Sequence, residues 1–122
     1  MLLIIDTTDK ECLVGWDDGR KLAIKKWRWE KDTGSEVLDN IQKLLRKHAN
    51  NLKKIKAILV NQGPGSYTGT RVGITIANSL GWSLNIPVVG YSGRKLSKKN
   101  QVFAKLSKNK LSKNHFPTPI YE

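Results

Sequence analysis

The sequence predicts an α/β fold in which α-helices pack on a mixed β-sheet. Strand-like segments fill the first quarter of the chain, and two of them flank the hairpin signal Asp17-Asp18-Gly19-Arg20. Two helix-like segments then alternate with short apolar runs that are typical of buried parallel strands. At 122 residues the chain has the size of one domain.

The first three strands are expected at residues 1–6, 11–16 and 21–29. The third of these alternates only in part, and Leu22, Ile24 and Trp27 are its expected buried positions. Further strands are expected at residues 57–60 and 86–90, each after a helix. Three antiparallel strands followed by this alternation give a mixed sheet.

The first helix is expected over residues 33–49. Thr33 and Glu36 fit a capping box, and basic residues gather near the end, as the helix dipole favours. His48 lies on the apolar side and is expected to be a core or interface histidine. The apolar stripe consists of Val37, Leu38, Ile41, Leu44 and Leu45.

A glycine-rich turn precedes the second helix, which is expected over residues 72–84. The turn lacks the Gly-Lys-Ser/Thr ending of a phosphate-binding loop. Two interpretations stay open: a tight strand-to-helix connection, or a contact for an anion or a partner at the helix start. The residues concerned are Gly63, Pro64, Gly65, Ser66, Tyr67, Thr68, Gly69 and Arg71.

The second helix has no charged residue between positions 72 and 86, which is typical of a helix covered on all sides. At 100° per residue, one side carries Val72, Gly73, Ile76, Ala77, Leu80 and Leu84, and we expect this side to cover the sheet. The opposite side needs a second cover, and a partner protein is the simplest one. Its residues are Ile74, Asn78, Gly81 and Trp82. Arg71 stands where the helix dipole disfavours a cation, so an acidic group or an anion is expected nearby.

Charge is concentrated at the C-terminal end. The chain has a net charge of +12, and residues 93–122 hold 8 of its 22 basic groups but only 1 of its 10 acidic groups. This favours a polyanionic partner such as RNA or an acidic protein surface, although lysine-rich surfaces also serve solubility. The single Cys12 fits a reducing compartment. No signal peptide or membrane-spanning run is recognised, so a cytoplasmic location is expected.

Two stretches carry a resemblance to a known family: NQGPGSYTGTRVG at residues 61–73 and IPVVGYS at residues 86–92. Together with LLIIDTT at residues 2–8, they resemble the TsaB family, which supports synthesis of threonylcarbamoyladenosine on tRNA. The resemblance covers residues 1–92. It implies the ribonuclease H-like half of the actin, sugar kinase and Hsp70 superfold.

The resemblance also implies a domain organisation. Residues 1–92 would form a single ribonuclease H-like lobe, and residues 93–114 a basic, partly helical linker in place of most of a second lobe. Residues 115–122 resemble the segment with which many TsaB proteins end.

The function implied is that of a non-catalytic subunit that binds a TsaD-like enzyme. A TsaE-like ATPase would be reached through the complex, and tRNA indirectly or through the basic tail. The two helices lie side by side in TsaB, so a homodimer or a contact with the paralogue is expected there, with or without a nucleotide between them. The expected interface consists of Val37, Leu38, Ile41, Leu45, Ile74, Asn78, Gly81 and Trp82.

Independent catalysis is not expected. Ser66 has only His48 and His115 as bases, without a motif around either, and no metal-ligand spacing is present. Asp6, with Thr7 and Thr8, is either a vestigial nucleotide site or a turn residue that binds nearby backbone amides. No cofactor is assigned. The alternative function is a stand-alone basic RNA-binding module with Trp27 and Trp29 as stacking residues.

Overall fold

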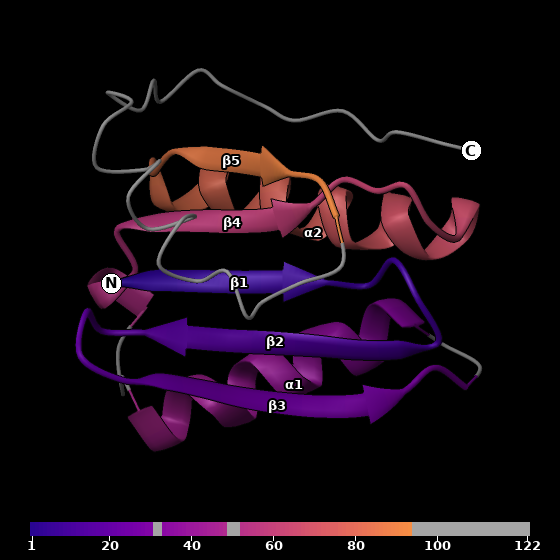
Figure 1. Ribbon diagram of the computed structural model, residues 1–122. Helices are drawn as coiled ribbons and strands as arrows, with labels where there is room; N and C mark the ends of the chain where they lie inside the picture. The colour runs from indigo at the N-terminus through magenta and orange to yellow at the C-terminus, as the bar shows by residue number, and fades with distance from the viewer. Residues whose placement is uncertain (31–32, 49–51, 94–122) are drawn as a thin grey trace.

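The computed structural model describes residues 1–30, 33–48 and 52–93. They form one five-stranded sheet in the order β3-β2-β1-β4-β5 (Figure 1). The strands are β1 Leu2–Asp6, β2 Glu11–Asp17, β3 Leu22–Arg28, β4 Ala57–Asn61 and β5 Val88–Tyr91. Strands β1, β4 and β5 pair in parallel, whereas β2 pairs antiparallel with both β1 and β3. The predicted mixed sheet is confirmed.

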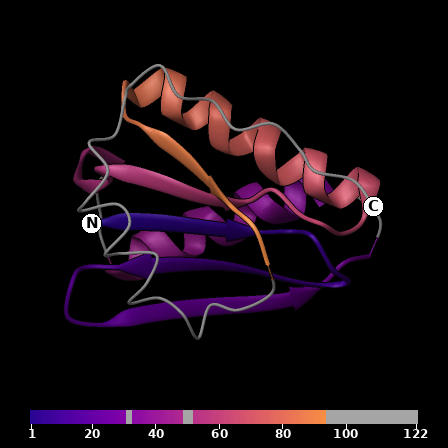
Figure 2. The same cartoon turned by 45° about the horizontal axis from the view of Figure 1, so that its top comes forward.

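Two α-helices, α1 Thr33–His48 and α2 Tyr67–Leu84, cover the same face of the sheet (Figures 1 and 2). A short 3-10 helix, η1 Leu52–Lys54, leads from α1 toward β4. Because α1 follows β3 and α2 follows β4, both helices begin at the edge where β1 and β4 end. Within the described ranges, no helix is long and apolar enough to cross a membrane.

The main core lies between the sheet and the two helices. Its strand residues alternate along the sequence, as a pleated strand requires, and α1 contributes its apolar stripe. The buried members are Leu3, Ile5, Val14, Trp16, Val37, Ile41, Leu44, Leu45, Ile55, Ile58, Val60, Ile74, Ala77 and Val88. The alternate strand positions Leu2, Ile4, Ala57 and Leu59 form a second buried cluster on the other face.

The expectation that Ile24 is buried is wrong: Ile24 is 41% exposed, and on β3 it is Ala23 and Trp27 that pack against the main core. His48 is exposed at the last residue of α1, so it is not a core histidine, and the interface role that was the alternative stays a prediction. Leu22, in contrast, does pack, against the second cluster. The side chain of Thr33 is not among those described, so the expected capping box lies outside the described part of the structure.

Helix α2 begins five residues earlier than expected, at Tyr67 rather than at position 72. Ser66 is its N-cap: the Ser66 Oγ accepts a hydrogen bond from the Gly69 N–H at 3.2 Å. Asn85 ends the helix in the left-handed conformation, with φ 55° and ψ 49°. The glycine-rich stretch is therefore part turn and part first helical turn.

Candidate functional site

The carboxylate of Asp6 at the end of β1 is held by its own chain. Asp6 is 8% exposed, and its Oδ1 accepts hydrogen bonds from the Thr8 N–H at 3.0 Å and the Thr8 hydroxyl at 2.8 Å. Its Oδ2 accepts from the Asn61 amide at 3.0 Å. Asp6 thus makes the local backbone contact expected of a turn residue. A role in nucleotide binding remains a prediction.

The glycine-rich turn packs directly on Thr7 and Thr8. A Cβ on Gly65 would lie 2.5 Å from the Thr8 carbonyl oxygen, and one on Gly69 would overlap the Thr7 carbonyl and the Trp29 ring. The Thr7 hydroxyl donates to the Gly69 carbonyl, and the Ser66 N–H donates to the Thr8 carbonyl at 2.8 Å. The glycines are therefore needed for close packing of the turn against the end of β1.

The hydrogen bonds of the glycine-rich turn help to distinguish a tight strand-to-helix connection from an anion or partner contact. Its amide N–H groups at Gly63, Ser66 and Gly69 already donate to Asn61, Thr8 and the Ser66 hydroxyl, respectively. A phosphate loop keeps such groups available for its ligand. These three contacts support a tight connection, and an anion or partner contact at the start of α2 stays a prediction.

Sequence reasoning missed Asn61, which links three segments. This residue is 1% exposed, and its side-chain amide bonds Asp6, the Gly63 N–H and the Gly93 carbonyl. It joins the ends of β1 and β4 to the turn and to the end of β5. The sequence did contain a signal for this role: Asn61 is a polar residue directly after an apolar run and two positions before a glycine.

Among the residues that the structure describes, which do not include His115, no catalytic constellation forms around Ser66. Its hydroxyl oxygen caps α2, and His48 lies at the far end of a 16-residue helix that begins at the same edge, roughly 24 Å along the axis. Burial and the charge of Asp6 raise the pKa of the buried Cys12 thiol to about 12, so it is not a nucleophile at neutral pH. Among the described residues, no group of three His, Cys, Asp or Glu could hold a metal.

Most of the expected interface residues on α1 are buried in the monomer. Val37, Ile41 and Leu45 are 0%, 4% and 6% exposed and belong to the core. Leu38 alone of the four expected residues on this helix is an exposed apolar side chain, at 50%. The apolar stripe of α1 was treated as one binding surface, but most of its side chains pack against the sheet.

On α2, two of the four expected interface residues face the sheet. Ile74 is 4% exposed, and a Cβ on Gly81 would overlap Val88, so both residues face the sheet. Glycines let the helix approach the sheet more closely than a row of larger side chains would. Val72, Ile76, Leu80 and Leu84 are only partly buried at the edge of the core. Trp82 is 78% exposed, as a surface position requires.

Two mostly apolar hollows lie beside the two helices. The larger, about 910 Å³, lies among residues of α1, η1 and α2 that include Leu38, Ile41, Leu45, Leu52 and Leu80. The smaller, about 450 Å³, shares Leu38 with it and lies near the start of α2. We call the two hollows together the α1–α2 groove.

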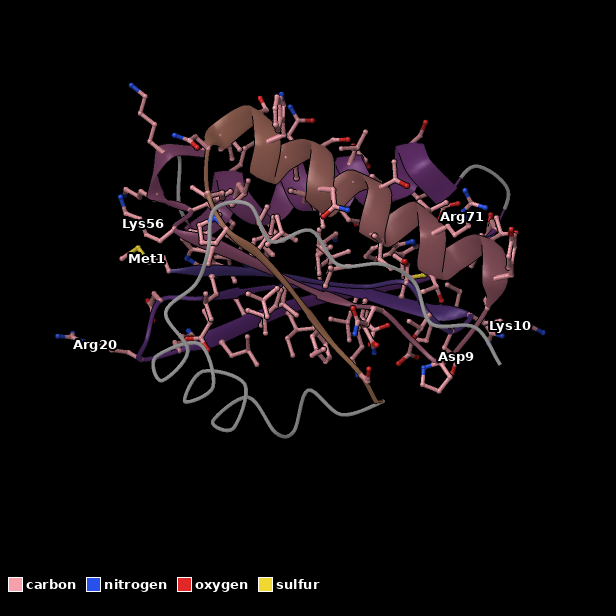
Figure 3. All side chains as sticks on the ribbon, turned by 90° about the horizontal axis from the view of Figure 1, so that it is seen from above. Met1, Asp9, Lys10, Arg20, Lys56 and Arg71 are labelled. Carbon is pink, nitrogen blue, oxygen red and sulfur yellow. The ribbon has the colours of Figure 1, made fainter. Side chains whose placement is uncertain are left out.

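Arg71 and Tyr67 flank the groove where α2 begins. The Arg71 Nη1 donates a hydrogen bond to the Tyr67 Oη at 2.8 Å, and the guanidinium carbon lies 5.5 Å from the ring centroid. Figure 3 shows Arg71 at the same end of the molecule as Asp9 and Lys10, opposite to Met1 and Lys56. An acidic partner for Arg71 stays a prediction.

Trp82 does not belong to the α1–α2 groove. Leu80 lines the groove, and two helical residues later the side chain points roughly 160° away around the axis. Trp82 is therefore on the flank of α2 that faces away from α1. The expected interface consists of two separate surfaces.

The two tryptophans considered for RNA stacking are engaged in packing. Trp27 is partly buried against the main core, and the ring of Trp29 lies against Gly69. A stacking platform needs aromatic faces open to the bases. This weighs against the stand-alone RNA-binding alternative.

The sheet order, with both helices on one face, defines a ribonuclease H-like α/β protein. The fold aligns with YeaZ from Pseudomonas aeruginosa at a TM-score of 0.70 and 26% identity, over 75% of this chain and 44% of that one. A second crystal structure, of an uncharacterized protein with similarity to peptidase YEAZ from the same organism, gives 0.71 at 26% identity, over 75% and 42%.

Residues 31–94, just over half of the chain, match the family model described as TsaD, tRNA N6-adenosine threonylcarbamoyltransferase. The chain belongs to this family, and the curated relatives that it resembles are named as TsaB proteins.

Those relatives carry the name tRNA threonylcarbamoyladenosine biosynthesis protein TsaB. The Escherichia coli (strain K12) protein is 35% identical over 92 residues, which are 75% of this chain and 39% of that protein. The Haemophilus influenzae protein is 33% identical with the same coverage. The Bacillus subtilis protein is 53% identical over 38 residues, 31% of this chain and 17% of that protein. The chain thus spans about two fifths of the length of the relatives it matches most broadly.

Proposed function

We propose that this chain is a non-catalytic subunit that binds a TsaD-like enzyme and supports threonylcarbamoyladenosine modification of tRNA. The observation that carries the proposal is the α1–α2 groove in a chain whose relatives are TsaB proteins. A TsaE-like ATPase would join through the complex, and a homodimer through the groove is a competing assembly.

The groove has the features of a helix-binding surface. Leu38 and Leu52 are 50% and 46% exposed on its rim, and Ile41, Leu45 and Leu80 form its apolar floor and wall. An amphipathic helix recognises such a groove by inserting a few apolar anchors at helical spacing. Leu38 is already half-buried, so covering the rest of its side chain contributes about 1 kcal/mol, roughly half of the value for a fully exposed leucine.

The geometry around Ser66 supports a non-catalytic role. Its hydroxyl caps α2, and the described part of the chain brings no histidine or carboxylate pair to it. Purified alone, the protein should neither hydrolyse ATP nor modify tRNA. Turnover that disappears in the Ser66→Ala or Asp6→Ala variant would contradict this part of the proposal.

Co-purification with the TsaD-like protein of the same organism tests the contact. Leu38→Asp should reduce binding by at least tenfold, because the carboxylate would be buried against apolar side chains. Ile24→Asp is the matched control: Ile24 is also an exposed apolar residue, at 41%, but lies on β3, away from the groove. Equal binding by both variants would place the interface elsewhere.

Trp82→Ala distinguishes the two surfaces of α2. Loss of binding in this variant, with normal binding by Leu38→Asp, would move the proposed interface to the flank that faces away from α1. The alternative function, a basic RNA-binding module, rests on the net charge of +12. RNA affinity that is high without the TsaD-like protein and falls steeply with salt would favour it.

A further inference from the structure

Positive charge is concentrated at the end of the molecule where β1 begins. Figure 3 shows Met1, Lys56 and Arg20 at this end, whereas Asp9 and Lys10 lie at the opposite one. The basic residues that gather here are all exposed, and they come from the hairpin between β2 and β3, the last turn of α1, and the segment around η1. They are Arg20, Lys21, Arg46, Lys47, Lys53, Lys54 and Lys56. We call this surface the basic end.

The directions of the strands and of α1 bring these segments together. Strands β1 and β4 are parallel and both start here, and the Lys56 N–H donates a hydrogen bond to the Met1 carbonyl at 2.9 Å. The hairpin between β2 and β3 turns back at the same edge, because Asp17 pairs with Leu2. Helix α1 starts at the opposite edge and therefore ends at this one, beside η1 (Figure 1).

Few carboxylates offset this charge. The described residues 1–3, 17–22, 44–48 and 52–57 form the basic end, and their acidic members are Asp17 and Asp18. Both carboxylates bind backbone N–H groups of the hairpin. Asp17 accepts from Gly19 at 2.8 Å, and Asp18 accepts from Arg20 and from Lys21, each at 2.8 Å. The basic end therefore carries a net positive charge.

The helix dipole and solubility account for only part of this pattern. The dipole favours cations in the last turn of α1, which explains Arg46 and Lys47. It does not explain Lys54 and Lys56, which lie beyond that helix, and like charges gathered on one surface repel one another. A surface that serves only solubility can mix both signs. The opposite end does so with Asp9, Lys10, Glu11 and Arg28, which are all exposed.

We propose that the basic end binds the phosphate backbone of RNA, and that in the proposed complex this RNA is the substrate tRNA. Protein interfaces are depleted in lysine and enriched in aromatic residues, whereas contacts to phosphate use lysine and arginine. Five of the seven basic residues are lysines, and the described segments that form this end contain no Phe, Tyr or Trp. The chemistry therefore favours RNA phosphates over an acidic protein, without stacking on the bases.

The basic end adjoins the α1–α2 groove. Arg46 and Leu52 line the larger hollow, and they are neighbours in sequence of basic residues that do not line it. An enzyme bound in the groove would leave Lys54 and Lys56 beside the contact, within reach of an RNA that the enzyme holds. Naming this RNA as tRNA rests on the proposed function, whereas the contact with RNA phosphates rests on the basic end alone.

The test measures binding of an unmodified tRNA transcript to the full chain by fluorescence anisotropy over a range of salt concentrations. Lys54→Gln with Lys56→Gln removes two charges from the basic end without altering the lining of the groove. The affinity at about 0.1 M salt should fall at least about fivefold, and the slope of log K against log salt should become shallower by about 1.5, because each phosphate contact contributes nearly one unit.

The matched control, Lys10→Gln with Lys26→Gln, removes two charges near the opposite end, where Lys26 pairs with Glu11. It should keep the tRNA affinity within about twofold of wild type, because distant exposed charges are screened by salt. Circular dichroism shows whether each variant keeps its fold. Equal losses in the two variants would mean that RNA responds only to net charge, and unchanged affinity in the basic-end variant would place the RNA contact elsewhere; either result overturns the proposal.

Co-purification of the same variants with the TsaD-like protein separates this proposal from the proposed function. The basic-end variant should co-purify as wild type does. Loss of co-purification with normal tRNA affinity would make the basic end a protein contact and overturn the proposal. A wild type that fails to co-purify, but whose tRNA affinity falls in the basic-end variant alone, would reject the proposed function and support the RNA contact.

Discussion

Replacing Ile74 by alanine should destabilise the isolated monomer strongly. Ile74 is 4% exposed in the core between α2 and the sheet. Removing buried methylene groups there costs the lost transfer free energy and leaves a cavity, about 3 kcal/mol in total. With an m-value of about 2 kcal/mol/M, the urea midpoint should fall by about 1.5 M.

Trp82→Ala is the matched comparison on the same helix. Trp82 is 78% exposed, so its truncation should change the free energy of unfolding by less than ~0.5 kcal/mol. Urea unfolding followed by circular dichroism measures both variants. If the two midpoints move equally, the assignment of the sheet-facing side of α2 is wrong and Ile74 lies on the surface, as the sequence alone suggested.

Three further predictions concern the turn and the core. Gly69→Ala should destabilise the protein by about 1–3 kcal/mol, because its Cβ would overlap Thr7 and Trp29, as urea unfolding would show. Gly34→Ala, where nothing lies within 4 Å, should instead stabilise α1 by about 0.5 kcal/mol; a loss at both glycines would refute the packing argument. Asn61→Leu should lower the free energy of unfolding by about 2 kcal/mol or more, because Asp6 and the Gly93 carbonyl lose their amide donor. An unchanged melting temperature would mean that water replaces the amide. Cys12 has a pKa raised to about 12, so at pH 8 it should react with a thiol reagent only as fast as the protein unfolds; rapid labelling of the native protein would contradict its burial.

The arrangement of strands could be predicted because each strand has a local signal. The Asp17-Asp18-Gly19-Arg20 turn joins β2 to β3, and the apolar runs of β1 and β4 fit parallel neighbours buried on both faces. The end of α2 could also be predicted, because asparagine tolerates the left-handed conformation that Asn85 adopts. These signals act within a few residues and need no knowledge of the rest of the chain.

The side of α2 that faces the sheet could not be predicted from hydrophobicity alone. Val72, Ile76 and Leu80 form the more apolar stripe, but Gly73 and Gly81 allow a closer approach and carry Ile74 into the core with them. The start of the helix was missed because three glycines suggested a longer turn. The role of Asn61 depends on residues 55 and 32 positions away, so no local pattern could reveal it.

The absence of charge on α2 is explained only in part by the monomer. One side of the helix packs on the sheet through Ile74 and Gly81, and a second side borders the α1–α2 groove through Leu80. A third side carries Trp82, which is 78% exposed. Since the groove and Trp82 lie on opposite flanks of α2, one helix of a partner cannot cover both. If the groove is the binding surface, Leu38→Asp should weaken co-purification with the TsaD-like protein, whereas Trp82→Ala should leave it unchanged; the reverse result would place the contact on the Trp82 flank.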